Sequence, residues 1–395
     1  MKNWKRIFAL LLSLALTVSL CACGGVNGDP TSGTANPSPN DGTSQDPDTE
    51  PTIEVDLTQD TIAFAAGLSG DDILLTVNGE DIPADLFLYW LFWDCYYFEY
   101  SYYYYGVTVA DFVDMLMDDT VDMAAYYTVL RQKTAELGCL PTDAQLQEAK
   151  DKMLADGQES YDNLKTAYGL SDWSMDYLST VSCYYENLLD ALVPAATDEM
   201  LNSYVYQVKH ILLKTVDDQN QPLSDDEIAA QKALAEDILA QLQAVEGEER
   251  LALFDELMNQ YSEDGRDEET GDLYAPDGYT AVPGDMVAEF EEASLALPIG
   301  GLSGIVESSY GYHIILRGEV ADLESYADEC REHQMDKEMD ALTETAEITR
   351  APALDALDVA TFYERYMAYQ NAVMEQYEAS RGSDSSGGDG EDAVG

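Results

Sequence analysis

Basic side chains are scarce in this sequence: 19 lysine and arginine residues stand against 77 aspartate and glutamate residues, for a formal net charge of −58. Proteins bind nucleic-acid phosphates largely through lysine and arginine, so the composition excludes a nucleic-acid-binding protein. Histidine occurs only at His210, His313 and His333, which is too few for a histidine-rich metal site. We therefore predict no nucleic-acid partner and no metal, and we place His333, in a charged helical run, on the surface.

Long apolar runs are also lacking, apart from one near the N-terminus. Lys2, Lys5 and Arg6 precede an apolar run over residues 7–20, which is shorter than the roughly 20 residues of a membrane-spanning helix. This pattern predicts a secretory signal peptide over residues 1–22. The Leu-Cys-Ala-Cys sequence that ends at Cys23 resembles a bacterial lipobox. The resemblance implies a lipid anchor on Cys23, which would hold the protein at the extracytoplasmic face of the bacterial cell membrane. An ordinary signal peptide with incidental cysteines is the alternative.

Two segments have too few apolar residues to form a core. Residues 24–52 contain five of the 13 prolines and no aromatic residue, and residues 381–395 are rich in serine, glycine and aspartate. We predict a disordered tether over residues 23–71, beginning with the lipidated Cys23, and a disordered tail over residues 381–395.

The body of the chain has no Cys-x-x-Cys motif, so neither a redox motif nor a zinc knuckle is supported. Its four cysteines are Cys95, Cys139, Cys183 and Cys330. An exported protein can form disulfides, and four cysteines allow three pairings. The spacing selects none of them.

Helical patterns dominate two long segments of the body. Thr142-Asp143-Ala144-Gln145 has the arrangement of a capping box at the start of a helix. Trp173, Tyr177 and Val181 recur at helical spacing, and helical patterning resumes at Asp322. We predict that residues 72–203 and 319–380 pack together as one mainly helical, discontinuous domain.

The run from Phe87 to Tyr105 is unusually aromatic, with 13 aromatic residues among 19. On a helix such a density covers every face, so the segment cannot be exposed on all sides. One interpretation makes it the core of the helical domain. The other lets some members, such as Tyr103 and Tyr104, line a groove for unfolded chains, because tyrosine combines apolar area with a polar tip.

Between the helical segments, residues 204–318 read as a strand, three helices and two strands. Residues 205–214 are rich in β-formers, Ser224 is a helix N-cap, and residues 313–316 close the pattern with a strand. This order predicts a compact α+β domain inserted into the helical one.

The sequence of this α+β segment resembles the parvulin family of peptidyl-prolyl isomerases. Matching motifs occur in the family's order: Val208-Lys209-His210-Ile211-Leu212, Phe254-Asp255-Glu256-Leu257, Tyr261-Ser262-Glu263-Asp264, Gly271-Asp272-Leu273, Met286 to Ala293, Gly301-Leu302-Ser303 and Tyr310-Gly311-Tyr312-His313-Ile314-Ile315. Together with the lipobox and the flanking helices, the whole chain resembles PrsA-type foldase lipoproteins, which are related in plan to the SurA chaperones.

The resemblance implies which residues form the site. His210 and His313 match the family's paired histidines, and Asp264 falls where parvulins carry Cys or Asp. The implied proline pocket consists of Leu273, Met286, Phe290 and Tyr310. Two departures stand out: the stretch from Gly271 to Met286 is longer than in minimal parvulins, and Glu307 and Ser308 replace more typical residues.

The implied activity is cis–trans isomerisation of X–Pro bonds in unfolded or partly folded exported polypeptides. This rotation breaks no bond, so we expect no cofactor. Phosphorylated substrates are not supported, because the loop around Glu263 and Asp264 contains a lone Arg266 and no basic cluster. A holdase chaperone with a catalytically weak parvulin domain is the main alternative, and a ligand-binding lipoprotein is a third. The sequence leaves a homodimer open.

Overall fold

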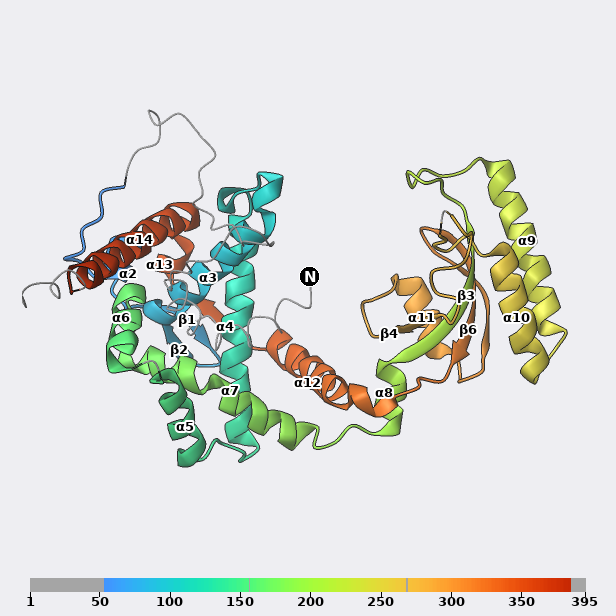
Figure 1. Cartoon of the computed structure of the whole chain (residues 1–395). Coiled ribbons are helices and arrows are strands. Elements are labelled where there is room, and N and C mark those ends of the chain that lie inside the picture. Colours follow the sequence, from blue (N-terminus) through green and yellow to red (C-terminus); the bar gives the residue numbers. More distant parts are fainter. Residues whose placement is uncertain (1–52, 156, 268, 385–395) are drawn as a thin grey trace, which may run out of the picture. The chain divides into compact units, whose positions relative to one another are not determined.

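The computed structural model describes residues 53–155, 157–267 and 269–384, so the predicted signal peptide and Cys23 lie outside the described residues. The chain divides into two compact units. Of the described residues, those up to Leu192 and from Met335 onward form a helical unit, and those within Val193–Gln334 form an isomerase-like unit (Figure 1). This architecture confirms an α+β segment inserted into a mainly helical, discontinuous domain.

The helical unit is built from segments at both ends of the chain. Its helices are α2 (Thr61–Ala66), α3 (Ala84–Tyr102), α4 (Val113–Glu136), α5 (Asp143–Met153), α6 (Gln158–Tyr168), α7 (Asp172–Leu192), α13 (Pro352–Asp355) and α14 (Val359–Asp384). Helix α12 (Ala327–Glu344) begins in the isomerase-like unit and ends in this one. The predicted capping box of α5 is present, with the Thr142 hydroxyl and the Gln145 side chain bonding each other's backbone N–H.

A small sheet joins the two ends of the helical unit. Strand β1 (Ile73–Val77) pairs antiparallel with β2 (Glu80–Pro83) on one side and with β7 (Ile348–Arg350) on the other. Asn78 and Gly79, both at positive φ, make the tight turn between β1 and β2. Since β7 follows the inserted unit, the sheet is completed only by the C-terminal segment.

The predicted tether over residues 23–71 is too long at its C-terminal end. Asp60 accepts a hydrogen bond from the Ala63 N–H and so caps helix α2, which lies beside α14 (Figure 1). Ile62 and Phe64 are buried, and the Phe64 ring lies 5.6 Å from that of Tyr369. A short apolar cluster therefore suffices to anchor residues 61–66 to the helical unit.

Helix α3 carries most of the aromatic run and is largely buried. Trp90 and Phe87 are almost fully buried, and the ring of Phe92 lies 4.5 Å from that of Tyr366 in α14. At the end of the run the environment changes, because Tyr104 and Tyr105 are 81% and 78% exposed. The first part of the aromatic run therefore forms part of the core of the helical unit, as one of the two interpretations predicts, and its last part, from Tyr102 to Tyr105, lies on the surface.

The isomerase-like unit is built on a four-stranded antiparallel sheet of order β4-β3-β6-β5. Its strands are β3 (Tyr206–Lys214), β4 (Tyr279–Ala281), β5 (Leu302–Glu307) and β6 (Gly311–Gly318). Its other elements are α8 (Asp198–Tyr204), α9 (Asp225–Gln243), α10 (Gly247–Tyr261) and α11 (Ala288–Ala296). The predicted strand–helices–strands order is confirmed, with the short strand β4 added between the helices.

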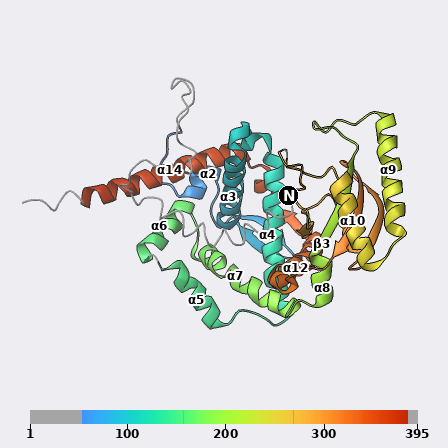
Figure 2. The ribbon, with the colours of Figure 1, turned by 45° about the vertical axis from the view of Figure 1, so that its right-hand side comes forward.

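The two faces of this sheet are covered by different helices. Ile211 and Ile314 point to the face that packs against α9 and α10, whereas Val208 and Ile315 point to the face that packs against α11. Figure 2 shows α9 and α10 together beside β3. Alternate residues of β3 and β6 therefore belong to separate cores.

This unit extends beyond the predicted range of 204–318 at both ends. Leu201 and Tyr204 of α8 pack with Cys330 of α12 in a third buried cluster. His333 also belongs here: its ring lies 5.1 Å from that of Tyr204 and it is half-buried. The predicted surface position of His333 is therefore wrong, because its helix packs against α8.

The four cysteines of the body are free thiols in this structure. Burial, with Asp94 and Glu99 nearby, raises the pKa of the Cys95 thiol far above its usual range. Among the described residues, none of the helices is both long and apolar enough to span a bilayer.

Candidate active site

Two histidines meet on the α11 face of the central strands. In the register of β3 and β6, His210 pairs with Ile315 and Leu212 pairs with His313, so the two histidines are diagonal neighbours on one face. Their Nδ1 atoms lie 3.2 Å apart, and the two rings are nearly parallel. Both side chains are buried. The strand register thus creates an imidazole pair from residues 103 positions apart.

The loop that follows α10 brings Asp264 to this pair. The N–H of Leu212 donates to the Ser262 hydroxyl at 3.1 Å, and the N–H of Glu263 donates to the Leu212 carbonyl at 2.8 Å. These bonds hold the loop against β3 beyond the point where β4 ends. As a result, Oδ2 of Asp264 lies 3.1 Å from Nε2 of His210.

Two further side chains, neither of them expected in the site from the sequence, extend the network. The Tyr279 hydroxyl donates to Oδ2 of Asp264 at 2.6 Å. The Ser308 hydroxyl lies 2.7 Å from Nε2 of His313. The Ser308 position attracted notice only as a departure from the family pattern, and Tyr279 lies in the segment whose length differs from that pattern.

The network sets the charges of its members. Burial by itself would raise the pKa of Asp264, but the hydrogen bonds from His210 and Tyr279 outweigh it and hold the pKa at about 2. Burial, together with the neighbouring His210, lowers the pKa of His313 to about 4. Burial and the bond to the carboxylate raise the pKa of Tyr279 to about 12. At neutral pH the site therefore contains an ionised Asp264, a neutral His313 and a protonated Tyr279.

These charges define the direction of the hydrogen bonds when both imidazoles are neutral. The Asp264 carboxylate can only accept, so Nε2 of His210 carries the proton and Nδ1 of His210 is an acceptor. Nδ1–H of His313 then donates to His210, and Nε2 of His313 accepts from the Ser308 hydroxyl. All the bonds run one way, from Ser308 to Asp264, which fixes both rings in one tautomer and orientation.

An apolar residue closes the site from the side of α11. The Phe290 ring stands edge-on to both imidazoles, with centroids 5.0 Å from His210 and 5.3 Å from His313. Phe290 is buried, and the half-buried Met286 packs in the same cluster. The structure thus brings together five of the residues expected in the site or its pocket, namely His210, Asp264, Met286, Phe290 and His313.

Leu273 was wrongly assigned to the pocket. It is buried on the opposite face of the sheet, in the cluster of Ile211, Ile314 and the helices α9 and α10. A backbone bridge between Leu273 and Arg266 fixes this course of the loop. Tyr310 lies at the turn before β6 with a side chain that is 45% exposed, and its N–H donates to the Ser308 hydroxyl at 3.2 Å. Its link to the site therefore runs through its backbone.

A known protein family matches the sequence of this unit. Residues 196–320 match the family model of the PPIC-type PPIase domain. This range covers all the strands and histidines of the site described above, as well as α8 to α11.

Several relatives also match. The Bacillus cereus foldase protein PrsA 4 is 43% identical over 76 residues, which are 19% of this chain and 26% of that protein. The Chromobacterium violaceum chaperone SurA is 35% identical over 111 residues, 28% of this chain and 22% of that protein. The Staphylococcus aureus foldase protein PrsA is 26% identical over 239 residues, 59% of this chain and 70% of that protein.

The chain matches only 22% to 31% of the length of three of these relatives, the Bacillus cereus foldase proteins PrsA 4 and PrsA 3 and the Chromobacterium violaceum chaperone SurA. Among solved structures, a peptidylprolyl isomerase (PrsA) from Bacillus cereus covers 78% of this chain and 93% of its own, with 19% identity and a TM-score of 0.31. The chain therefore carries a parvulin domain of the PPIC-type peptidyl-prolyl isomerase family over residues 196–320 and is a relative of the PrsA-type foldases.

Proposed function

We propose that this protein is an exported, membrane-anchored foldase that binds unfolded exported polypeptides and catalyses cis–trans isomerisation of their X–Pro bonds. The observation that carries the catalytic part is the 3.2 Å contact between His210 and His313, with Phe290 against both rings. Binding of unfolded chains is supported by the relatives named as foldases and chaperones.

The reaction sets modest chemical demands. Rotation about the X–Pro bond faces a barrier of about 18–20 kcal/mol, because the amide loses its resonance in the twisted state. An apolar wall around the proline ring lowers this barrier, since it removes the water that stabilises the planar, more polar amide. Phe290 and Met286 supply apolar surface of this kind beside the imidazole pair. No covalent intermediate and no proton transfer are needed.

The histidine pair then acts by positioning. The one-way hydrogen-bond chain from Ser308 to Asp264 engages all four ring nitrogens and holds both rings in place, so the pair forms a fixed polar surface beside the rotating amide without donating a hydrogen bond to it. A preorganised polar group stabilises a transition state without reorganising during the reaction. We assign His210, His313 and Asp264 to this polar surface and Phe290 and Met286 to the proline pocket.

Export and anchoring form the finer part of the proposal. They are supported by the charged start, the short apolar run and the lipobox-like residues that end at Cys23. Labelling growing cells with a radioactive fatty acid tests the anchor: the wild-type protein should carry the label, and a Cys23→Ser variant should not.

A proline-limited refolding assay tests the catalytic part with the full-length mature chain. We expect the wild type to accelerate the slow phase, and His210→Ala and His313→Ala each to reduce kcat/KM by about tenfold or more. Far-UV circular dichroism and amide NMR spectra of each variant show whether the unit that carries the histidines is folded. Folded variants with wild-type activity would remove the histidine pair from the mechanism.

A further inference from the structure

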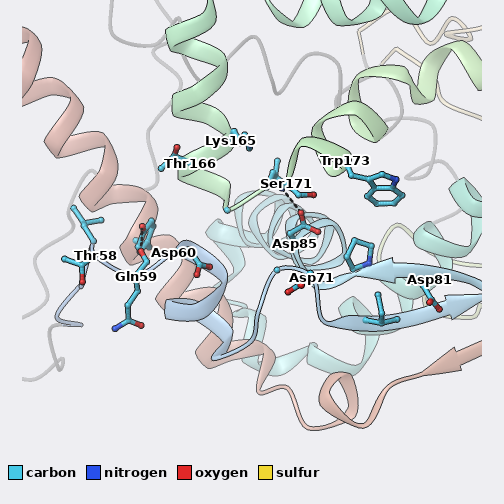
Figure 3. Close-up of a pocket in the computed structure, with 17 residues that line it drawn as sticks. Thr58, Gln59, Asp60, Asp71, Asp81, Asp85, Lys165, Thr166, Ser171 and Trp173 are labelled. Atoms are coloured by element: carbon cyan, nitrogen blue, oxygen red, sulfur yellow. Dashed lines mark hydrogen bonds between the residues drawn. The ribbon is translucent and has the colours of Figure 1, made fainter. Parts of the chain in front are cut away.

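The helical unit contains a pocket of about 720 Å³, far from any residue of the isomerase site along the chain. Its walls come from the segment before α2, the start of β1, strand β2, the start of α3, the α6–α7 connection and α14. Figure 3 shows Thr58, Gln59 and Asp60 at one end of the pocket and Asp81 and Trp173 at the other. A volume of this size holds a ligand of several residues rather than a single ion.

The apolar part of the lining is open to solvent. Leu57, Ile73 and Trp173 are 38%, 41% and 45% exposed, although each is a large hydrophobic side chain. Large apolar side chains gathered around a concave surface are typical of binding sites. Trp173 is the strongest candidate for an anchor, because a Trp ring offers a large apolar face and an electron-rich π system.

The charges around this apolar lining are almost all negative. Asp60, Asp71 and Asp81 lie exposed in the lining, and Asp85 is buried in it. Asp85 accepts hydrogen bonds from the Ser171 N–H and the Ser174 hydroxyl, both at 2.7 Å, so uncharged donors hold its carboxylate (Figure 3). Uncharged donors stabilise this group but leave its negative charge uncompensated by a cation.

Lys165 does not offset this charge. It is the basic residue in the lining, and its ammonium group forms an ion pair with Asp172 at the start of α7. The pocket therefore presents a negative potential together with an apolar surface, and this combination complements a ligand that is cationic and apolar.

Two simpler occupants fit poorly. Within the part of the chain that the structure describes, no group of three or more acidic, histidine or cysteine side chains is close enough to hold a metal ion, so these aspartates are too widely spaced for one. The chain's own preceding segment, residues 24–56, contains acidic residues and no lysine or arginine. Like charges would repel it from the pocket.

We propose that this pocket binds segments of unfolded client polypeptides in which lysine or arginine alternates with large apolar residues. This inference rests on the proposed function, because it names the client class that the foldase prefers. The apolar side chains would contact Leu57, Ile73 and Trp173, and the cationic groups would lie beside the aspartates of the lining.

Fluorescence anisotropy with labelled peptides on the full-length mature chain tests this. One probe alternates lysine with leucine, and the other has glutamate in place of each lysine. The variant pair Asp71→Asn/Asp81→Asn should bind the lysine peptide about fivefold more weakly. A matched pair, Asp122→Asn/Glu375→Gln, removes the same net charge at exposed positions of the same unit outside the pocket lining and should stay within about twofold of wild type.

The outcomes separate this inference from the proposed function. If both double variants lose the same affinity for the lysine peptide, the pocket proposal is overturned, because the net charge of the molecule then explains the binding. If the glutamate peptide binds as tightly as the lysine peptide, it is also overturned, because the pocket then has no preference for cationic segments. A Trp173→Ala variant that binds the lysine peptide as tightly as wild type overturns it as well. Suppression of client aggregation by the wild type is measured in parallel. If the wild type does not suppress aggregation, this counts against the foldase function. If it does suppress aggregation but the pocket variants bind the lysine peptide like wild type, only the pocket proposal is overturned.

Discussion

The hydroxyl of Tyr279 and the imidazole of His210 both bind the same carboxylate oxygen, Oδ2 of Asp264, at 2.6 Å and 3.1 Å. Asp264 thus links a side chain of strand β3 to a side chain of strand β4. The tyrosine supplies a neutral donor, so it stabilises the ionised carboxylate without adding a charge.

Replacing Tyr279 with Phe should raise the pKa of Asp264 by about one unit from its value near 2, because one of the two side-chain donors is lost. Carbon-13 NMR titration of labelled aspartate measures this directly. Tyr274→Phe, at an exposed tyrosine of the same unit, is the control. An unchanged titration of Asp264 would show that the Tyr279 hydroxyl does not contribute to its charge.

The stability of the protein should depend on His313 in mildly acidic solution. The pKa of His313 is about 4 in the folded chain and about 6.5 in an unfolded one, so between these values only the unfolded chain binds the proton. The free energy of unfolding therefore keeps its full value above pH 6.5 and decreases as the pH falls toward 4, by on the order of 3 kcal/mol.

Urea unfolding at pH 7 and pH 4.5 checks this expectation by comparing wild type with His313→Asn. The variant cannot titrate at this position, so its stability should fall less between the two pH values. Asp264 has little effect in this window, because its lowered pKa removes stability only as the pH falls from about 3.9 toward 2. Identical pH dependence in the two proteins would contradict the assignment.

Phe290 and Leu273 provide a matched pair for testing the pocket. Both are buried, on opposite faces of the same sheet. Either change to Ala should destabilise the protein by about 2–5 kcal/mol. Phe290→Ala should also reduce kcat/KM for an X–Pro peptide by about tenfold, whereas folded Leu273→Ala should stay within about twofold of wild type. The same loss of activity in both variants would mean that stability, rather than contact with the proline, explains it.

The exposed tyrosines after α3 should affect client binding without affecting the fold. Tyr103 and Tyr104 are 45% and 81% exposed. Changing both to Ser should weaken suppression of client aggregation, yet alter the free energy of unfolding by less than about 1 kcal/mol. Light scattering of an aggregating client measures the first quantity and urea unfolding the second. Undiminished suppression would exclude this surface from client binding.

The resemblance to the family's motifs pointed to His210, His313 and Phe290, and the structure brings these three side chains together on one face of the sheet. The same resemblance pointed to Leu273, but this residue lies in a loop, where strand or helix periodicity assigns no face, and it is buried on the opposite face of the sheet, with a backbone bridge to Arg266. Tyr279 was missed because its contact with Asp264 depends on the path of that same loop, whose length departs from the family pattern.

The pairing that closes the small sheet of the helical unit was equally hard to predict. Strand β7 has only three residues and pairs with β1 across more than 270 positions. Local propensity over so few residues is weak, and the pairing is decided by tertiary packing. The discontinuous helical domain could be predicted from composition and periodicity, but the strand that closes it could not.

The pairing of β1 with β7 has a consequence for a chain that is synthesised from its N-terminus. The central unit is continuous in sequence and can fold as soon as residue 334 has emerged from the ribosome. The helical unit must wait for residues 348–350, so its early half remains incomplete until synthesis is almost finished. Synthesis therefore imposes an order of maturation: the unit with the histidines is ready first, and the helical unit closes last.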